Sequence, residues 1–406
     1  MTQKSGSLCV RLYHKKAKKS IDKTFFIFYS ESMSKNLLIT LMYADGLHGG
    51  VKYSAELGNY LTSLGYNVYL CGMITNDETK EFFAQNNIKM FNVSEFPTNI
   101  KFDLVWAHHW PILPFLIRRG LKYEYLINSC ISHFLLVERP LWFHKNVDLC
   151  LTLTEQTKLL FLTKYNIPNK KIEILPNTAP DTFFDYKFKS NEKLTNIAIV
   201  SNHPPMELFQ ASEILKQRGF NVDIYGQKTK SIDITPSVLS KYDVVVTIGK
   251  TVQYSLAMGI PVYNYDHFGG TGYITLDNLN EEEAYNFSGR NHFTKKSAEN
   301  IADEIINQFE SVKKQQKQLK NITKSKYKLS TRINKIIKKV YSKKPVKKIK
   351  QTNKNRIFFD YCEMTINMNC YHNGKKRGVT IFDFKTILPK EPPIARLLRH
   401  IKTFKF

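Results

Sequence analysis

Residues 242–275 combine a buried strand, a glycine turn and a helix start, an arrangement that can bind an anion. Residues 244–246 belong to the continuous apolar run expected of a parallel strand covered on both faces. Gly249 then permits a turn, and Lys250 and Thr251 follow at the expected helix start. Backbone N–H groups and the positive end of a helix dipole at such a turn favour a diphosphate. A structural turn between strand and helix that binds no ligand has the same pattern and stays an alternative.

The stretch 36–69 repeats this order of elements about 200 residues earlier in the chain. Its strand is followed by a loop with His48, Gly49 and Gly50, and then by the apolar spacing of a helix that ends at Gly65. We expect the glycine pair to supply a second cradle of N–H groups. His48 could orient an acceptor or act as a base, although a water-exposed loop histidine would look the same. Two such units predict an α/β protein with two Rossmann-like domains that face each other across a cleft.

Four fragments resemble, in order and spacing, the motifs of bacterial glycosyltransferases with the GT-B architecture. The most similar group is the large retaining family (family 4, group 1) that builds lipopolysaccharide, capsule and other surface glycans. The fragments are GGVKYSAELGNYLTSLGYNV at 49–68, FDLVWAHHW at 102–110, EILPNTAPDTFF at 173–184 and SLAMGIPV at 255–262. The resemblance covers residues 34 to about 310. It implies an N-terminal acceptor domain and a C-terminal domain that binds a nucleotide-sugar donor.

The resemblance also implies roles for individual residues. His108 matches the family histidine that contacts the donor sugar, and Asn202 lies in a loop, SNHPP, that follows a predicted strand at the donor side. The loop DHFGGT at 266–271 is expected to line the cleft, and NFSGR at 286–290 carries an arginine able to meet a phosphate. A structural histidine, a proline turn and a plain loop are the respective alternatives. The predicted catalytic residues are His108 and His48, and the predicted donor-binding residues are Gly49, Gly50, Asn202, Gly249, Lys250, Thr251, Val252, Tyr254, Gly269, Gly270 and Arg290.

The sequence departs from the family at positions that carry its chemistry. Retaining members have two glutamates eight positions apart, and the second of these positions is Tyr254 here; no glutamate lies between residues 242 and 279. The SNHPP loop occupies the place of the arginine and lysine that grip the diphosphate in the family. We expect Lys250 and Arg290 to supply the lost positive charge, and Tyr254 to stack or hydrogen-bond on the nucleoside.

Length and composition fit an enzyme with two hydrophobic cores. The chain has 406 residues, of which 42% are hydrophobic and 23% charged. No apolar run reaches the roughly 18 residues that span a bilayer, and we expect a cytoplasmic protein without a signal peptide. Of the six cysteines, Cys71, Cys130 and Cys150 are expected to be small buried residues, and no CxxC pair indicates a zinc site. We expect no cofactor and no metal, since the predicted cleft motifs contain no Asp-x-Asp.

Positive charge is concentrated near the end of the chain. The formal net charge is +25, and residues 311–356 contain 18 Lys or Arg and no Asp or Glu. Such a run is often a solvated helix face or a tail, but it could also attract anionic lipid or nucleic acid. Residues 394–404 place apolar side chains at helical spacing between basic ones, as in an interfacial amphipathic helix. We therefore expect segments 311–356 and 394–406 to bind an anionic membrane surface, and we expect no nucleic-acid partner, because no nucleic-acid-binding module is recognised.

The chain is expected to have five regions. They are a basic N-terminal extension (1–33), an acceptor domain (34–180), a donor domain (181–310), a basic helical or linker segment (311–356) and a C-terminal segment (357–406). The extension is either an appendage or the result of an upstream start, with Met33 as the alternative first residue. Within the donor domain we expect strands at 196–200, 222–225, 244–248 and 261–263, and a helix at 206–218 that ends at Gly219.

The functional hypothesis is a peripheral enzyme at the inner face of the cytoplasmic membrane. It would transfer a sugar from a nucleotide-sugar donor to a lipid-linked glycan acceptor in the synthesis of lipopolysaccharide or capsule-type polysaccharide. One alternative, favoured by the missing glutamates, is a catalytically degenerate GT-B protein that serves as a nucleotide- or glycan-binding scaffold. A second alternative is a nucleic-acid-binding protein that acts through its basic tail, with binding that depends steeply on salt.

Overall fold

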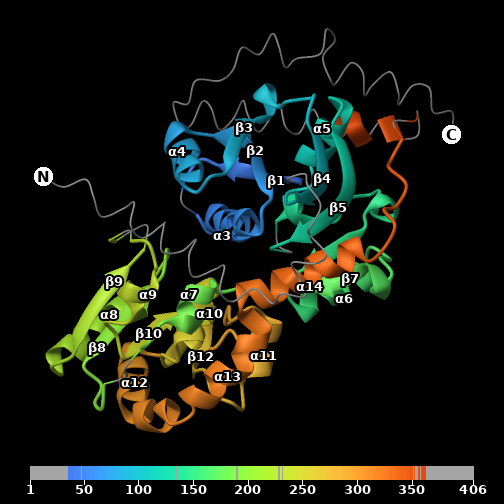
Figure 1. Ribbon diagram of the computed structural model, residues 1–406. Helices are drawn as coiled ribbons and strands as arrows, with labels where there is room; N and C mark the ends of the chain where they lie inside the picture. Colours follow the sequence, from blue (N-terminus) through green and yellow to red (C-terminus); the bar gives the residue numbers. More distant parts are fainter. Residues whose placement is uncertain are drawn as a thin grey trace, which may run out of the picture. The chain divides into compact units, whose positions relative to one another are not determined.

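The computed structural model describes residues 35–46, 48–132, 135–188, 191–226, 229–230, 232–350, 352, 355–356 and 358–362. The described residues divide into two compact units, one formed by residues within 35–128 and 346–362 and the other by residues within 129–345 (Figure 1). The predicted N-terminal extension and the predicted amphipathic helix at 394–406 lie outside the described residues. The predicted domain boundaries stay predictions.

The strands form two sheets. The first sheet has the order β3-β2-β1-β4-β5-β6-β7, and the second has the order β12-β11-β10-β8-β9. The strands of the first sheet are β1 (Asn36–Ala44), β2 (Asn67–Thr75), β3 (Lys89–Asn92), β4 (Lys101–Ala107), β5 (Lys122–Cys130), β6 (Leu149–Thr152) and β7 (Ile172–Ile174). Those of the second are β8 (Asn196–Val200), β9 (Asn221–Tyr225), β10 (Val244–Thr247), β11 (Val262–Asp266) and β12 (Gly269–Tyr273). In the second sheet only β12 is antiparallel to its neighbour.

Helices connect the strands and cover the sheets. The α-helices are α3 (Gly49–Ser63), α4 (Asp77–Gln85), α5 (Ile112–Arg118), α6 (Glu155–Thr163), α7 (Asp181–Asp185), α8 (Met206–Gln217), α9 (Pro236–Leu239), α10 (Lys250–Met258), α11 (Leu279–Ala284), α12 (Ala298–Lys313), α13 (Gln316–Tyr327) and α14 (Leu329–Tyr341). Short 3-10 turns are η1 (Val93–Glu95), η2 (Leu136–Glu138), η3 (His144–Asn146) and η4 (Asn169–Lys171). The predicted helix at 206–218 is confirmed as α8, and Gly219 follows it with a φ of +90°.

Both faces of the second sheet are covered, as the apolar run in β10 predicts. Val244 packs in one core cluster with Leu208 of α8 and Ile301 of α12. The next residue, Val245, packs in another cluster with Leu256 of α10, to which α13 also contributes. Because successive side chains of a strand point to opposite faces, α8 and α12 lie on one side of the sheet and α10 and α13 on the other (Figure 1).

Each sheet has a point at which the strand order reverses. In the first sheet the chain moves from β1 outward to β2 and later returns to β4 on the other side of β1. In the second it moves from β8 to β9 and returns to β10 on the other side of β8. Ligands of open α/β sheets bind outside the carboxyl ends of the strands at such reversals. The two glycine turns of the sequence follow β1 and β10, which are strands of these two reversals.

The basic segment is largely part of the folded second unit. Leu319 of α13 and Ile336 of α14 are fully buried. Lys335 and Lys339 both donate to the Glu173 carboxylate at 2.6 Å. Lys326 donates to Glu283 at 2.6 Å. Part of the positive charge that we predicted to bind a membrane surface therefore forms ion pairs within the protein. Among the described residues of the segment, the exposed lysines are Lys314, Lys317, Lys324, Lys335, Lys338, Lys343, Lys344, Lys347 and Lys350, and one of them, Lys335, also binds Glu173.

The expectation of buried cysteines is confirmed for Cys71, Cys130 and Cys150. All three are free thiols with almost no exposed surface, and burial raises the pKa of each thiol well above its ordinary value. Within the described part of the chain no helix is long and apolar enough to cross a membrane.

Candidate functional site

Strand register places three loops of the second sheet at the same level. Val200 of β8 and Asn264 of β11 both pair with Thr247 of β10, the strand between them. Two residues after Val200, Thr247 and Asn264, the chain reaches Asn202, Gly249 and Asp266, respectively. The predicted donor-binding residues Asn202 and Gly249 therefore lie at the carboxyl edge where the strand order reverses.

The glycine turn after β10 has the geometry that the sequence predicts. Gly249 precedes α10 with φ 62° and ψ −134°, a conformation closed to residues with a side chain. Its N–H donates to the Phe287 carbonyl at 3.2 Å, which attaches the turn to the loop at 286–290. Lys250, Thr251 and Val252 form the first turn of α10, whose N-terminus is the positive end of the helix dipole.

The loop at 286–290 is held in an unusual backbone conformation beside this turn. Asn286 and Phe287 have φ values of +56° and +53°, in the left-handed region that residues with a Cβ rarely adopt. The Asn286 Oδ1 accepts a hydrogen bond from Asn177 Nδ2 at 3.0 Å. Asn177 belongs to the EILPNTAPDTFF motif, so this motif contacts the candidate site through the loop.

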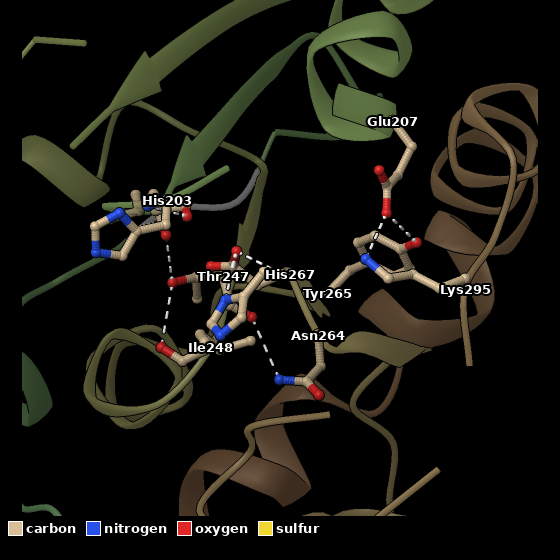
Figure 2. Close-up of polar contacts among 11 residues, drawn as sticks. His203, Glu207, Thr247, Ile248, Asn264, Tyr265, His267 and Lys295 are labelled. Atoms are coloured by element: carbon tan, nitrogen blue, oxygen red, sulfur yellow. Dashed lines mark hydrogen bonds and ion pairs between the residues drawn. The ribbon is translucent and has the colours of Figure 1, made fainter. Parts of the chain in front are cut away.

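Asn264 was not among the predicted site residues, although it links two parts of the site. Its Nδ2 donates to the Thr247 carbonyl at 3.3 Å (Figure 2) and to the Phe287 carbonyl at 2.8 Å. The residue has no exposed surface, and its Oδ1 has no hydrogen-bond partner among the described residues. A polar residue inside a buried apolar strand was the signal that could have identified it.

The predicted glycine loop at 266–271 is wrong in its secondary structure. Gly269 and Gly270 begin β12, which forms a tight antiparallel hairpin with β11. A Cβ on Gly270 would lie 1.9 Å from the Asn264 carbonyl oxygen, and one on Gly269 would lie 2.1 Å from the Thr294 carbonyl oxygen. The two glycines thus allow close packing of backbones, and a role in donor binding stays a prediction.

Tyr254 does not have the surface that stacking on a nucleoside requires. Its side chain is 5% exposed, and its ring stacks on Phe183 with centroids 4.3 Å apart. The Lys250 ammonium lies over the same ring, 5.6 Å from the centroid. Tyr254 is therefore a core residue of α10. It stands at the sequence position of a glutamate in the resembled family, but its side chain lies on the face of α10 that packs against the core.

Arg290 and the residues around Glu207 complete the charged groups of this edge. Arg290 is half-buried, and this burial lowers the pKa of its guanidinium. Glu207 in the first turn of α8 accepts from Lys295 at 2.9 Å and from the Tyr265 hydroxyl at 3.1 Å (Figure 2). Burial raises the pKa of Glu207, but the bond from Lys295 and other hydrogen bonds outweigh this effect, and the pKa is lowered.

The first sheet places the predicted histidines at its own reversal. His108 directly follows β4 and is fully buried; its carbonyl accepts from Thr40 Oγ1 at 2.8 Å, and its ring meets the edge of Tyr53. The next residue, His109, accepts from the Met42 N–H on Nδ1 at 2.8 Å, so the β1 backbone fixes its ring. The role of His108 in binding a sugar stays a prediction.

His48 precedes α3, whose first two residues are the predicted Gly49 and Gly50. Its Nε2 lies 2.8 Å from the Tyr43 carbonyl and donates to it, which leaves Nδ1 without a proton in the neutral ring. Burial lowers the pKa of His48, and the hydrogen bond to Tyr43 opposes this shift without cancelling it. A neutral imidazole with an unprotonated nitrogen is the form that a general base requires.

Comparison by sequence gives no match: no protein-family model matches the chain, and no curated protein matches it. Among solved structures, a glycosyltransferase from Rickettsia africae aligns with a TM-score of 0.51 and 14% identity, over 77% of this chain and 99% of that one. MurG of Acinetobacter baumannii gives 0.48 and 9%, over 76% and 100% of the two chains. A UDP-GlcNAc 2-epimerase from Neisseria meningitidis gives 0.46 and 13%, over 77% and 100%.

This chain has the GT-B fold. The first of these structures carries the assignment, and at 14% identity the likeness establishes the fold alone. Among the residues that the structure describes, no group of three or more His, Cys, Asp or Glu could hold a metal ion. The expectation that no metal takes part stays a prediction.

Proposed function

We propose that the protein transfers a glycosyl group from a nucleotide-sugar donor to a hydroxyl group of a glycan acceptor. The bond from the anomeric carbon to the diphosphate breaks, a bond to the acceptor oxygen forms, and a nucleoside diphosphate and a proton are released. The observation that carries the proposal is the common level of Asn202 and Gly249 at the reversal of the second sheet, beside the N-terminus of α10. The glycosyltransferase with the same fold adds support.

The diphosphate is the part of the donor that this edge suits best. The first turn of α10 offers the positive end of a helix dipole, and Lys250 and Arg290 add positive charge at the same edge. Stabilising the charge of the leaving diphosphate is the main electrostatic requirement of the reaction. On the first sheet, we propose His48 as the group that orients or deprotonates the acceptor.

A lipid-linked acceptor at an anionic membrane surface completes the proposal, in the setting of surface-polysaccharide synthesis. The exposed lysines of α13 and α14, including Lys317, Lys324 and Lys338, support it, because each basic residue near such a surface contributes about 1 kcal/mol. The same charge would also attract nucleic acid, and salt-dependent binding to duplex DNA without binding to vesicles would favour that alternative.

A thermal-shift series tests the donor. The full-length protein is melted with UDP-, GDP-, CMP- and dTDP-sugars, and a sugar nucleotide at 100 times its Kd should add about 2.7 kcal/mol of stability. Stabilisation by a UDP-, GDP- or dTDP-sugar, followed by release of its nucleoside diphosphate in the presence of an acceptor, supports the transferase. Stabilisation by the CMP-sugar alone, which carries a monophosphate, contradicts a diphosphate donor. Stabilisation without any release favours the degenerate scaffold. A cooperative melt that no donor shifts contradicts the proposed donor site.

A further inference from the structure

The end of β11 carries a histidine that the donor-site residues so far do not include. His267 directly follows Asp266, the last residue of β11, and its side chain is 42% exposed. Asp266 is level with Gly249 by strand register, so His267 lies at the carboxyl edge beside the start of α10. The position was inside the predicted loop at 266–271, but only its glycines were expected to bind the donor.

Asp266 holds the His267 imidazole in a defined orientation. The Asp266 side chain is 4% exposed, and its Oδ1 accepts from the His267 backbone N–H at 2.7 Å. The same Oδ1 lies 3.3 Å from the ring Nδ1, which donates to it (Figure 2). With Nδ1 bound to the carboxylate, Nε2 is the nitrogen left to meet a ligand.

Phe268 contacts both this histidine and Arg290. The His267 and Phe268 ring centroids are 4.0 Å apart, and the Arg290 guanidinium carbon lies 5.7 Å from the centroid of the same Phe268 ring. Two side chains that can carry positive charge, one from the end of β11 and one from the loop at 286–290, thus flank a single aromatic ring.

Two nearby lysines, Lys295 and Lys296, are engaged with carboxylates. Lys295 donates to Glu207 at 2.9 Å, and Lys296 donates to Glu304, so a carboxylate already balances each of these charges. His267 at the end of β11 and Arg290 in the loop at 286–290 can donate hydrogen bonds to an anion.

We propose that His267 and Arg290 together bind phosphate oxygens of the donor diphosphate, and that Asp266 is the positioning residue for His267. The imidazolium Nε2–H and the guanidinium N–H groups donate to the phosphate, while Nδ1–H stays on Asp266. This inference rests on the proposed donor site and adds a specific pair of ligands to it.

Calorimetric titration of the full-length protein tests the pair, with inorganic pyrophosphate and UDP as probes. Pyrophosphate reports on the phosphate ligands whichever nucleotide the protein prefers. His267→Gln and Arg290→Gln should each weaken pyrophosphate binding about tenfold or more, as expected for loss of a hydrogen bond to a charged group. Lys295→Gln is the matched control, and its effect should stay below about twofold because its charge is paired and exposed. Each variant is melted first to verify that it folds.

A double-mutant cycle tests the role of Asp266. Asp266→Asn should weaken pyrophosphate binding in the wild-type background and have little further effect in the His267→Gln background, because it acts through the ring. Equal losses in both backgrounds would show that Asp266 does not position His267. Unchanged binding in His267→Gln and Arg290→Gln would overturn the pair.

The outcomes separate this inference from the proposed function. Binding of sugar nucleotides that is independent of His267 and Arg290 overturns the pair and leaves the function standing. Pyrophosphate binding that depends on both residues, in a protein that no sugar nucleotide stabilises, supports the pair and contradicts the function. If the wild-type protein binds neither probe and no sugar nucleotide, both are overturned.

Discussion

Gly270 and Gly49 are both glycines of predicted donor loops, yet the structure gives them different surroundings. A Cβ on Gly270 would lie 1.9 Å from the Asn264 carbonyl oxygen, whereas one on Gly49 would meet nothing within 4 Å. Gly270→Ala must therefore move the β11 backbone, and we expect a loss of about 1–3 kcal/mol in the free energy of unfolding. Urea denaturation of the full-length protein measures it.

Gly49→Ala is the matched control for this substitution. Gly49 is the first residue of α3 and has an ordinary helical environment, so its replacement should change stability by less than about 0.5 kcal/mol. Similar losses of stability in both variants would show that replacing a glycine is destabilising in either place, and that the close contact between the β11 and β12 backbones is not the cause.

His48 should make the stability of the first unit sensitive to acid. Burial lowers the pKa of its imidazole in the folded state, so the unfolded chain takes up a proton first as the pH falls. The destabilisation is absent well above the unfolded pKa of about 6.5 and grows as the pH falls below it. We expect His48→Gln, whose amide can still donate to Tyr43, to lose less stability than the wild type between about pH 7.5 and 5.5.

Denaturant unfolding at several pH values, followed by a signal from the first unit, checks this prediction. The comparison with His48→Gln removes the contribution of all other titrating groups, which both proteins share. Parallel stability curves for the two proteins would contradict it.

At the scale of elements, the packing and ion pairs of α14 show that this part of the basic segment is folded rather than a tail. Its residue Ile336 has no exposed surface, and Lys335 and Lys339 on the same helix hold Glu173. Burial raises the pKa of Glu173, but the two lysine bonds outweigh burial and the pKa is lowered, which gives stability that is lost as the pH falls below about 4.5. The helix therefore belongs to the second unit.

Ile336→Ala should cost about 2–5 kcal/mol in the free energy of unfolding, as a large-to-small change in a core does. Thr331→Ala, at an exposed position of the same helix, is the control and should be close to neutral. Thermal and urea denaturation measure both variants. An Ile336→Ala protein as stable as the control would place α14 outside the cooperative core.

At the scale of the whole molecule, the net charge of +25 leads to a prediction about surfaces. Replacing the exposed Lys317, Lys324 and Lys338 by Gln should weaken binding to anionic vesicles by about 3 kcal/mol, roughly 100-fold, if each residue contributes about 1 kcal/mol. Co-sedimentation with vesicles that contain phosphatidylserine measures the effect, which should shrink as the salt concentration rises.

A second triple variant separates location from total charge. Lys164, Lys193 and Lys241 are exposed lysines outside the basic segment, and their replacement by Gln removes the same charge. Equal losses in the two triple variants would show that net charge alone drives binding. A loss of affinity for duplex DNA, in a protein that never binds the vesicles, would favour the nucleic-acid alternative.

The sequence alone determined the elements and their order at both reversals. Apolar runs and glycine turns act over a few residues, so they predicted β8, α8, β10 and the turn at Gly249, and with the four motifs they predicted the fold. The same local signals placed Asn202 and Gly249 at strand ends, where parallel strands bring them to one edge.

Only the tertiary structure decided which side chains and backbones meet. Asn264 and Phe287 are 23 residues apart and Lys339 and Glu173 are 166 apart, and neither contact leaves a periodic trace in the sequence. The way α10 packs directs the Tyr254 side chain into the core, where it stacks on Phe183. These contacts depend on how elements pack against one another, whereas the local pattern records only how each element exposes its own faces.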